Sequence, residues 1–344
     1  MGNDMTPSMT RQRAVTVGLI GAGRIGSAHA ETIARRVPGA TLVAVADPRP
    51  GVAETLAAPL GARGETDPAA IFAAADIDAV VITASSEAHC ELVVAAARAG
   101  KAVFCEKPMS LTLPDAERAI AAARDAGVQL QVGFNRRFAA DFAAAHEHVV
   151  SGAVGTPQLM RSVTRDPGLA DPGGVPPWTV FTQTLIHDFD ALLWLNPGAS
   201  PVEVYATADA LVAPEFKDSG LLDTAIVVIT FDNGARAVAE ASFSATYGYD
   251  IRAEVFGSSG MVTVGGAPRT SMVLSDAHGR HADTPRGDVD LFRDAYTDEF
   301  VEFTNAVREG RSPSVTGSDA RRALAVALAC VESVRTNAPV KVAP

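Results

Sequence analysis

Hydrophobic and polar positions form two alternating kinds of segment along the first 150 residues. Short apolar runs rich in valine and isoleucine predict buried strands at 15–20, 41–46, 79–83, 102–105 and 129–132. Ala-rich stretches between them predict helices at 24–37, 52–58, 88–99, 113–126 and 139–150. Strands that alternate with helices form βαβ units, so this region predicts an α/β fold, a Rossmann doubly wound parallel sheet covered on both faces.

The pattern changes near residues 152–155. Runs of strand composition then follow one another at 159–164, 202–206, 224–231, 235–243, 252–256 and 261–264, and the turn signal Asp232-Asn233-Gly234 lies between two of them. Two helical stretches, 291–308 and 319–335, close the chain. Sequential strands with short turns predict a C-terminal α+β domain built on a large open, mainly antiparallel sheet.

These changes divide the 344 residues into three predicted parts. Residues 1–13 are a polar, flexible leader, 14–135 the parallel α/β domain, and 136–344 the α+β domain. A C-terminal helix can pack back on the first domain. The open face of the second sheet is an expected contact surface for a homo-oligomer, either a dimer or a tetramer.

Composition excludes several kinds of partner. The formal net charge is −11 without a Lys/Arg cluster, so we expect neither nucleic acid nor a membrane surface as partner. No apolar run approaches the ~20 residues of a membrane span, and the polar start is not a secretory signal. Cys90, Cys105 and Cys330 show no metal-ligand or disulfide spacing. We therefore expect buried free thiols, no metal site, and a cytoplasmic protein.

The predicted strand 15–20 runs into the motif Gly21-x-Gly23-x-x-Gly26, and a helical stretch follows at once. Gly21 permits the tight turn, Gly23 lets the main chain approach a pyrophosphate, and Gly26 lets the helix pack close to its strand. Arg24 and Ile25 lie inside this turn and are expected to contact the same cofactor. The motif predicts a dinucleotide site, so we expect 14–135 to be a dinucleotide-binding domain and 136–344 a substrate-binding and oligomerisation domain.

An acidic residue ends the second predicted strand. Asp47 lies about 20 residues past the glycines, where a carboxylate binds the adenosine ribose of NAD. Ordinary turn glycines would leave Asp47 unexplained. Arg49, two residues on, can partly accommodate a 2′-phosphate, so we expect NAD as the cofactor and keep NADP as an alternative.

The segment from Thr83 to His89 follows a predicted strand of the parallel sheet. Ligands of such sheets lie at the carboxyl ends of strands, where the small polar Ser85 can line a ribose or nicotinamide. His89 can contact the cofactor or serve only as a structural residue at a helix start, and both interpretations stay open.

Glu106-Lys107-Pro108 follows the next predicted strand, so Lys107 would enter the same crevice, with Glu106 beside the cofactor. A lysine beside a nicotinamide can hydrogen-bond a substrate oxygen and stabilise its changing charge. Most lysines are instead surface residues, but this position favours the crevice. Pro108 can fix the turn, including through a cis bond.

His187 begins a helical stretch after a loop, 166–184, that is rich in proline and glycine. Long loops of this kind are often functional, and histidine is the usual proton acceptor near neutral pH. Taken alone, a histidine at a helix start is more often structural.

These residues together resemble the glucose–fructose oxidoreductase/inositol dehydrogenase/rhizopine-catabolism (Gfo/Idh/MocA) family. The resemblance runs from about residue 14 to 335, and its motifs are the glycine turn, Glu106-Lys107-Pro108, Gly133-Phe134-Asn135-Arg136-Arg137-Phe138 and Ile186-His187-Asp188-Phe189-Asp190. Arg165-Asp166-Pro167 and Tyr247-Gly248-Tyr249-Asp250 are more similar to the inositol dehydrogenase branch.

The resemblance implies an oxidoreductase that transfers a hydride between NAD(P) and a secondary alcohol or ketone of a cyclitol or sugar. It implies that Lys107 orients the reacting oxygen and that His187 exchanges its proton. The residues that it implies around the substrate are Asn135, Arg136, Arg165, Asp166, Gln183, His187 and Tyr249.

Gln183 departs from the inositol dehydrogenase pattern, in which an aspartate commonly lies four residues before this histidine. Glutamine can hydrogen-bond but cannot accept a proton. The substrate, whether inositol, another sugar or an aminocyclitol, therefore stays open, as does the direction of reaction. Two other functions on this fold are a non-catalytic sensor of NAD or sugar, and an enzyme that uses bound NAD transiently for epimerisation or elimination.

Overall fold

A computed structural model describes residues 13–169, 171–266 and 268–344, so all but the last residue of the expected leader lies outside the described residues. The first domain is a six-stranded parallel sheet in the order β3-β2-β1-β4-β5-β6. Its elements are β1 (Val15–Ile20), α1 (Arg24–Arg36), β2 (Ala40–Ala46), α2 (Val52–Ala57), β3 (Arg63–Glu65), α3 (Pro68–Ala73), β4 (Ala79–Ile82), α4 (Ser86–Arg98), β5 (Ala102–Glu106), α5 (Leu113–Ala126) and β6 (Leu130–Gly133). This order is the expected doubly wound topology.

Every strand and helix predicted for this domain is confirmed to within two residues at each end. Buried apolar strands such as β4, all four of whose residues are buried, produce a strong sequence signal. The sequence did not predict β3 or α3. β3 is a polar Arg-Gly-Glu segment at the edge of the sheet, paired only with β2, and three residues carry no periodic pattern.

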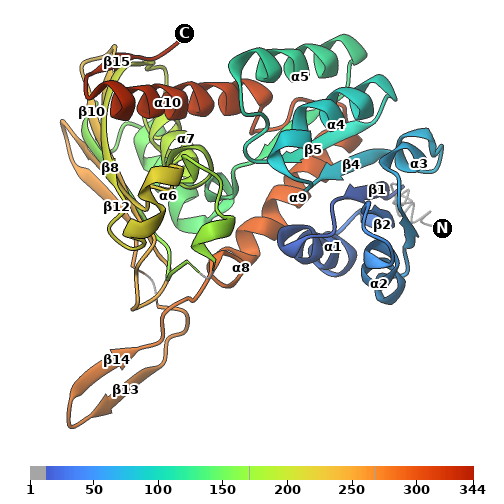
Figure 1. Ribbon diagram of the computed structural model, residues 1–344, viewed down its shortest axis with the longest axis horizontal. Coiled ribbons are helices and arrows are strands. Elements are labelled where there is room, and N and C mark those ends of the chain that lie inside the picture. Colours follow the sequence, from blue (N-terminus) through green and yellow to red (C-terminus); the bar gives the residue numbers. More distant parts are fainter. Residues whose placement is uncertain (1–12, 170, 267) are drawn as a thin grey trace, which may run out of the picture.

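The second domain is a seven-stranded sheet in the order β12-β11-β7-β10-β9-β8-β15. Only β7 and β10 pair in parallel, so the predicted mainly antiparallel sheet is confirmed. Buried and exposed residues alternate along β9 and β10, because α6, α7 and α10 cover one face (Figure 1). The strands are β7 (Pro157–Arg165), β8 (Pro201–Asp209), β9 (Thr224–Phe231), β10 (Arg236–Ser242), β11 (Asp250–Gly257), β12 (Met261–Gly265) and β15 (Val340–Lys341), and the helices are α6 (Ala140–Val150), α7 (Ile186–Trp194), α8 (Asp288–Leu291), α9 (Arg293–Glu309) and α10 (Gly317–Thr336).

Three features of this domain differ from the sequence prediction. The strands β13 (Val273–Asp276) and β14 (Gly279–Ala282) form an exposed hairpin that projects from the molecule (Figure 1). A hairpin without a buried face shows no alternation of apolar and polar residues, and the two-residue β15 is too short to show such an alternation. The prediction of a loop over residues 166–184 is partly wrong, because Val180–Thr184 forms a π-helical turn that leads into α7.

A helix from the C-terminal half packs against the first domain. Phe300 and Phe303 on α9 are buried in the same core as Phe104 of β5, with ring centroids 4.6 and 5.8 Å from the Phe104 ring. α9 also lies against α1 and β1 (Figure 1). Each aromatic pair stabilises the fold by about 1 kcal/mol beyond the effect of burying its apolar surface. This contact therefore fixes the two domains relative to each other.

The three cysteines are free and buried, as predicted. In the described part of the chain, no helix combines the length and the apolar character that crossing a membrane requires.

Candidate active site

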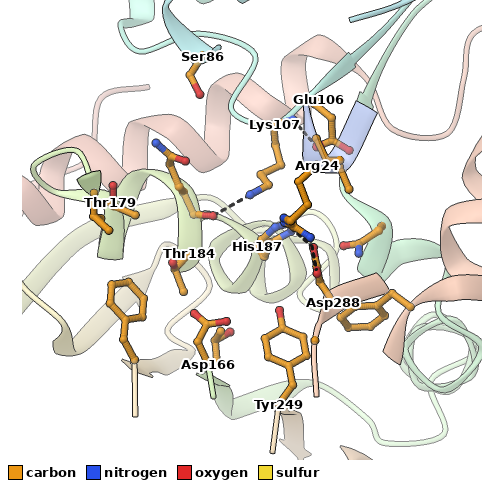
Figure 2. A pocket seen from close by; sticks show the side chains of 18 of the residues that line it. Arg24, Ser86, Glu106, Lys107, Asp166, Thr179, Thr184, His187, Tyr249 and Asp288 are labelled. Carbon is orange, nitrogen blue, oxygen red and sulfur yellow. Dashed lines mark hydrogen bonds and ion pairs between the residues drawn. The ribbon is translucent and has the colours of Figure 1, made fainter. Parts of the chain in front are cut away.

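A cavity of about 510 Å³ lies where the carboxyl ends of the parallel strands meet the second sheet. It brings together residues that are far apart in the sequence and that the sequence analysis singled out: Arg24, Ile25, His89, Glu106, Lys107, Asn135, Arg136, Asp166, Gln183, His187 and Tyr249. The predicted residues outside its lining are Gly21, Gly23, Gly26, Asp47, Arg49, Ser85 and Arg165. Ser86 rather than its neighbour Ser85 faces this cavity (Figure 2).

Lys107 extends into the cavity from the end of β5 (Figure 2). Its Nζ donates a hydrogen bond to the main-chain carbonyl of Gln183 at 3.0 Å, which leaves further N–H groups for a ligand. Burial lowers the pKa of Lys107, and the neighbouring Glu106 carboxylate opposes that shift. The bond between Lys107 and Pro108 is cis.

His187 lies one residue inside α7, and its ring meets Phe134 edge-on at 6.0 Å. Burial is the first cause that holds its pKa well below the ordinary value, followed by the positive charges of Lys107 and Arg136. The imidazole is therefore neutral at neutral pH. Nδ1 is buried and has no hydrogen-bond partner among the described residues.

A buried ion pair anchors the elements around His187. The Arg136 guanidinium donates to Asp188 at 2.8 Å and to the Thr164 hydroxyl at 2.6 Å. Ser162 and Thr164 both donate to the Asp188 carboxylate, at 2.5 and 2.6 Å. Arg136 and Asp188 are 2% and 0% exposed, so this network joins the turn that follows β6 to β7 and α7 with all charges paired.

Other polar groups face the same cavity. The buried Asn135 Oδ1 has no partner in the described structure. Burial raises the pKa of Asp166 to about 6, although Lys107 and Arg136 oppose the shift. Tyr249 meets Phe292 edge-on at 6.3 Å, and burial raises the pKa of its hydroxyl. These groups suit a ligand with several hydroxyls.

Two predicted residues are held by other parts of the protein. Arg165 donates to Glu240 at 2.7 Å, on the sheet and outside the cavity lining. His89 has Nδ1 at 2.8 Å from the Pro108 carbonyl and Nε2 at 3.0 Å from the Ala84 carbonyl. The His89 ring therefore links the loops that follow β4 and β5.

The glycine turn has the form of a phosphate-binding cradle. Gly21 has φ of +101°, which favours glycine, and a Cβ there would lie 2.6 Å from the main chain of Ala84. A Cβ on Gly26 would lie 1.9 Å from the Gly21 carbonyl oxygen. A Cβ on Gly23 would meet no described atom within 4 Å, so open space lies in front of the helix N-terminus.

Asp47 ends β2 beside this turn and accepts a hydrogen bond from the Ala22 N–H at 2.9 Å. Arg49 donates to both Asp47 oxygens at 2.8 Å. These hydrogen bonds lower the pKa of Asp47 to about 2, and those from the Arg49 side chain have the largest effect. Asp47 is thus ionised across the physiological range, next to the cradle.

Comparison with known proteins identifies the family. The sequence model of an oxidoreductase family with an NAD-binding Rossmann fold matches residues 15–134, and that of its C-terminal alpha/beta domain matches 176–342. The chain belongs to the Gfo/Idh/MocA oxidoreductase family. The resemblance inferred from the motifs is confirmed, and this family member is an NAD-dependent oxidoreductase.

Several of its relatives are named as inositol dehydrogenases. It is 37% identical to myo-inositol 2-dehydrogenase of Thermotoga maritima over 94% of this chain and 98% of that protein. It is 38% identical to inositol 2-dehydrogenase of Rhizobium meliloti, over 96% of this chain and 99% of that one. A solved structure of scyllo-inositol dehydrogenase from Lactobacillus casei with NAD(H) and scyllo-inositol has a TM-score of 0.92, at 27% identity over 96% and 100% of the two chains.

The sequence did not identify Asp288, which lines the cavity as the partner of Arg24. Arg24 and Asp288 form a two-pronged ion pair at 2.8 and 3.0 Å across the cavity (Figure 2). Asp288 follows a hairpin without sequence pattern, so no local signal identifies it. His29 and Glu299 were not predicted either; with Glu106 they form a buried group whose side-chain atoms lie close enough to hold a metal ion.

The cradle of the NAD-binding domain predicts opposite results for two substitutions. Gly26→Ala forces a methyl group against the Gly21 carbonyl, which cannot move away, and should lower the free energy of unfolding by about 1–3 kcal/mol. Gly23→Ala has space, so stability should stay within about 0.5 kcal/mol of wild type. Its methyl group would occupy the cofactor's path, and NAD affinity should fall about tenfold or more, a loss of about 1.4 kcal/mol.

Thermal unfolding and NAD titration calorimetry measure these two effects. If Gly23→Ala binds NAD normally, the open space in front of α1 is not where the pyrophosphate lies.

Proposed function

We propose that this NAD-dependent oxidoreductase interconverts a secondary alcohol and the matching ketone on a cyclitol, with Lys107 and His187 as catalytic residues. The convergence of Lys107 and His187 from different domains on one cavity carries the proposal. Relatives named as inositol 2-dehydrogenases support the cyclitol, as do the polar groups of Asn135, Asp166 and Tyr249.

In the direction of oxidation, His187 accepts the hydroxyl proton. Its lowered pKa keeps the ring neutral and ready to act as a base at neutral pH. The Lys107 ammonium donates a hydrogen bond to the same oxygen and stabilises its negative charge. NAD, when bound, supplies the hydride acceptor. The protein contributes position and charge, and reduction of a ketone uses the same groups in reverse.

We also propose a preference for NAD over NADP. Asp47 would accept a hydrogen bond from a ribose hydroxyl and repel a 2′-phosphate, while Arg49 beside it softens that discrimination. The ratio of kcat/KM for the two cofactors measures the preference.

A homo-oligomer, a dimer or tetramer, is part of the proposal. Monomeric proteins rarely expose large contiguous apolar patches. The outward face of the second sheet exposes six large apolar side chains: Leu159, Tyr205, Ile226, Val228, Phe256 and Met261. A second copy of the chain is the partner that would cover this face, and light scattering gives the copy number. We keep the cytoplasm as the proposed location because buried free thiols suit a reducing compartment.

A panel of cyclitols and sugars, scanned for NADH formation, tests the function. We expect one or more inositol isomers or related cyclitols to yield NADH in a one-to-one ratio with ketone product. A ligand that binds without forming NADH would favour a sensor. Product without accumulated NADH would favour transient use of the cofactor.

Replacing Lys107 separates chemistry from cofactor binding. In Lys107→Met, which keeps most of the side-chain volume but no charge, kcat should fall about a thousandfold, or about 4 kcal/mol of transition-state stabilisation. The affinity for NAD should change little, because the glycine turn and Asp47 hold the cofactor. A variant that keeps most of its kcat would contradict the assignment.

Replacing Gln183 tests His187 as the base. An aspartate near His187 favours the imidazolium and raises the pKa of His187. Because His187 must be neutral to accept a proton, the acidic limb of kcat/KM against pH should move to higher pH in Gln183→Asp.

Gln183→Asn is the matched control, since it has the size of aspartate without its charge, and it should leave the limb in place. An unmoved limb in Gln183→Asp would show that His187 is not the base or that residue 183 does not face it. Gained activity of Gln183→Asp on inositol would show that this position helps to select the substrate.

A further inference from the structure

Trp178 has a backbone conformation that bulky residues rarely adopt. Its φ is +63°, in the left-handed region. Among the described residues, Asn337 is the other non-glycine residue with a positive φ, and it ends α10, where asparagine commonly adopts this conformation. Trp178 instead precedes the π-helical turn before α7. Strained residues persist only where the surrounding structure holds them, and they cluster at functional sites.

Contacts with two other segments hold Trp178 in place. Its N–H donates to the main-chain carbonyl of Gly220 at 3.1 Å. The guanidinium of Arg335, in the last turn of α10, lies over the indole ring at 4.9 Å from the ring centroid. The ring is partly buried and packs against the hydrophobic core. A guanidinium over an indole face is a favourable cation–π contact, so the ring ties residue 178 to α10.

The carbonyl of Trp178 starts the π-helical turn Val180–Thr184. It accepts the N–H groups of Phe181 at 2.9 Å and of Thr182 at 3.1 Å, and also the Thr182 hydroxyl at 3.2 Å. Because the backbone torsions of residue 178 set the direction of this carbonyl, a different conformation there would redirect the turn.

This turn carries groups that face the candidate active site. Thr179, just before the turn, and Gln183 and Thr184 within it line the cavity (Figure 2). The Gln183 carbonyl accepts the hydrogen bond from Nζ of Lys107 at 3.0 Å. An acceptor next to an ammonium group directs that group and favours its charged form. The conformation of Trp178 is thus connected through the turn to the Lys107 ammonium.

We propose that Trp178 is a positioning residue for Lys107. The positive φ of residue 178 directs the π-helical turn towards the lysine, and the contact of the indole ring with Arg335 holds that conformation against its strain. The inference rests on the proposed role of Lys107 in orienting the substrate oxygen. The charged and titratable groups that face Lys107 stay in every variant below, and they are Glu106, Arg24, Asp288, Asp166 and His187.

Hydrogen exchange on the full-length protein tests the turn without using activity. The N–H groups of Phe181 and Thr182 bond to the Trp178 carbonyl, so their exchange rates report the stability of the turn. Trp178→Ala keeps the strain but loses the ring, and Arg335→Met removes the charge from the ring. Both variants should exchange these hydrogens about tenfold faster than wild type. Trp178→Gly should exchange them at close to the wild-type rate, because glycine adopts a positive φ without strain.

A double variant and a control separate this effect from a general loss of stability. Arg335→Met should have no further effect in the Trp178→Gly background, because neither ring nor strain remains there for Arg335 to act on. Arg321→Met is the matched control. Arg321 is another arginine of α10, but its guanidinium donates to Glu117, so its replacement should leave the exchange rates and kcat unchanged.

Kinetics then test the effect on Lys107. Trp178→Ala should lower kcat about tenfold with an unchanged affinity for NAD, and Trp178→Gly should keep kcat within about threefold of wild type. Loss of a well-placed acceptor at Gln183 in Trp178→Ala lowers the pKa of Lys107. Because Lys107 must keep its proton to donate a hydrogen bond, the basic limb of kcat against pH should move to lower pH.

Wild-type exchange or wild-type kcat in Trp178→Ala overturns the inference, as does a basic limb that stays in place. A Trp178→Gly variant as impaired as Trp178→Ala also overturns it, because the ring and not the conformation would then be needed. If Lys107→Met is fully active, the proposed function fails while the exchange result still stands or falls alone. Arg335→Met alters only an exposed side chain and keeps the test decisive if Trp178→Ala does not fold.

Discussion

The buried guanidinium of Arg136 is the constraint on which the geometry of the substrate side depends. A charge that is 2% exposed is tolerated only if a countercharge and hydrogen bonds replace its water, and Asp188 and Thr164 supply them, while Ser162 donates to Asp188. Because these partners come from β7 and α7, neither element can shift without leaving an unpaired buried charge. His187 is next to Asp188 in the chain, so the ion pair fixes the position of the proposed base.

A second pair of the same kind extends this constraint. Arg137 binds Asp190 at 2.8 and 2.5 Å and Asp319 at 3.2 Å, which ties the first turn of α10 to α7. The two consecutive arginines after β6 thus each form an ion pair with one of the two aspartates of α7. The positive charge of Arg136 also contributes, after burial and Lys107, to the lowered pKa of His187. One structural device therefore positions the histidine and helps to keep it neutral.

The two domains meet at the proposed catalytic residues. Lys107 comes from the parallel sheet and bonds the main chain of Gln183, which belongs to the π-helical turn before α7. Such turns are rare and often lie at functional sites. Gln183 thus contacts the lysine through its carbonyl, whatever its side chain does. The aromatic contact of α9 with β5 also holds the domains in this relation.

The sequence alone determined the parallel sheet, the glycine cradle and the family, because each depends on local patterns: apolar runs, glycines at fixed spacing, and motifs at strand ends. Exposed or very short elements such as β3 and the hairpin of β13 and β14 bury too little to leave such a pattern. Only the tertiary structure decided which charges pair. It placed Arg165 on Glu240, joined Arg24 to Asp288, and brought Glu299 to His29 across 270 residues of chain, since burial and partner choice depend on contacts that no local segment contains.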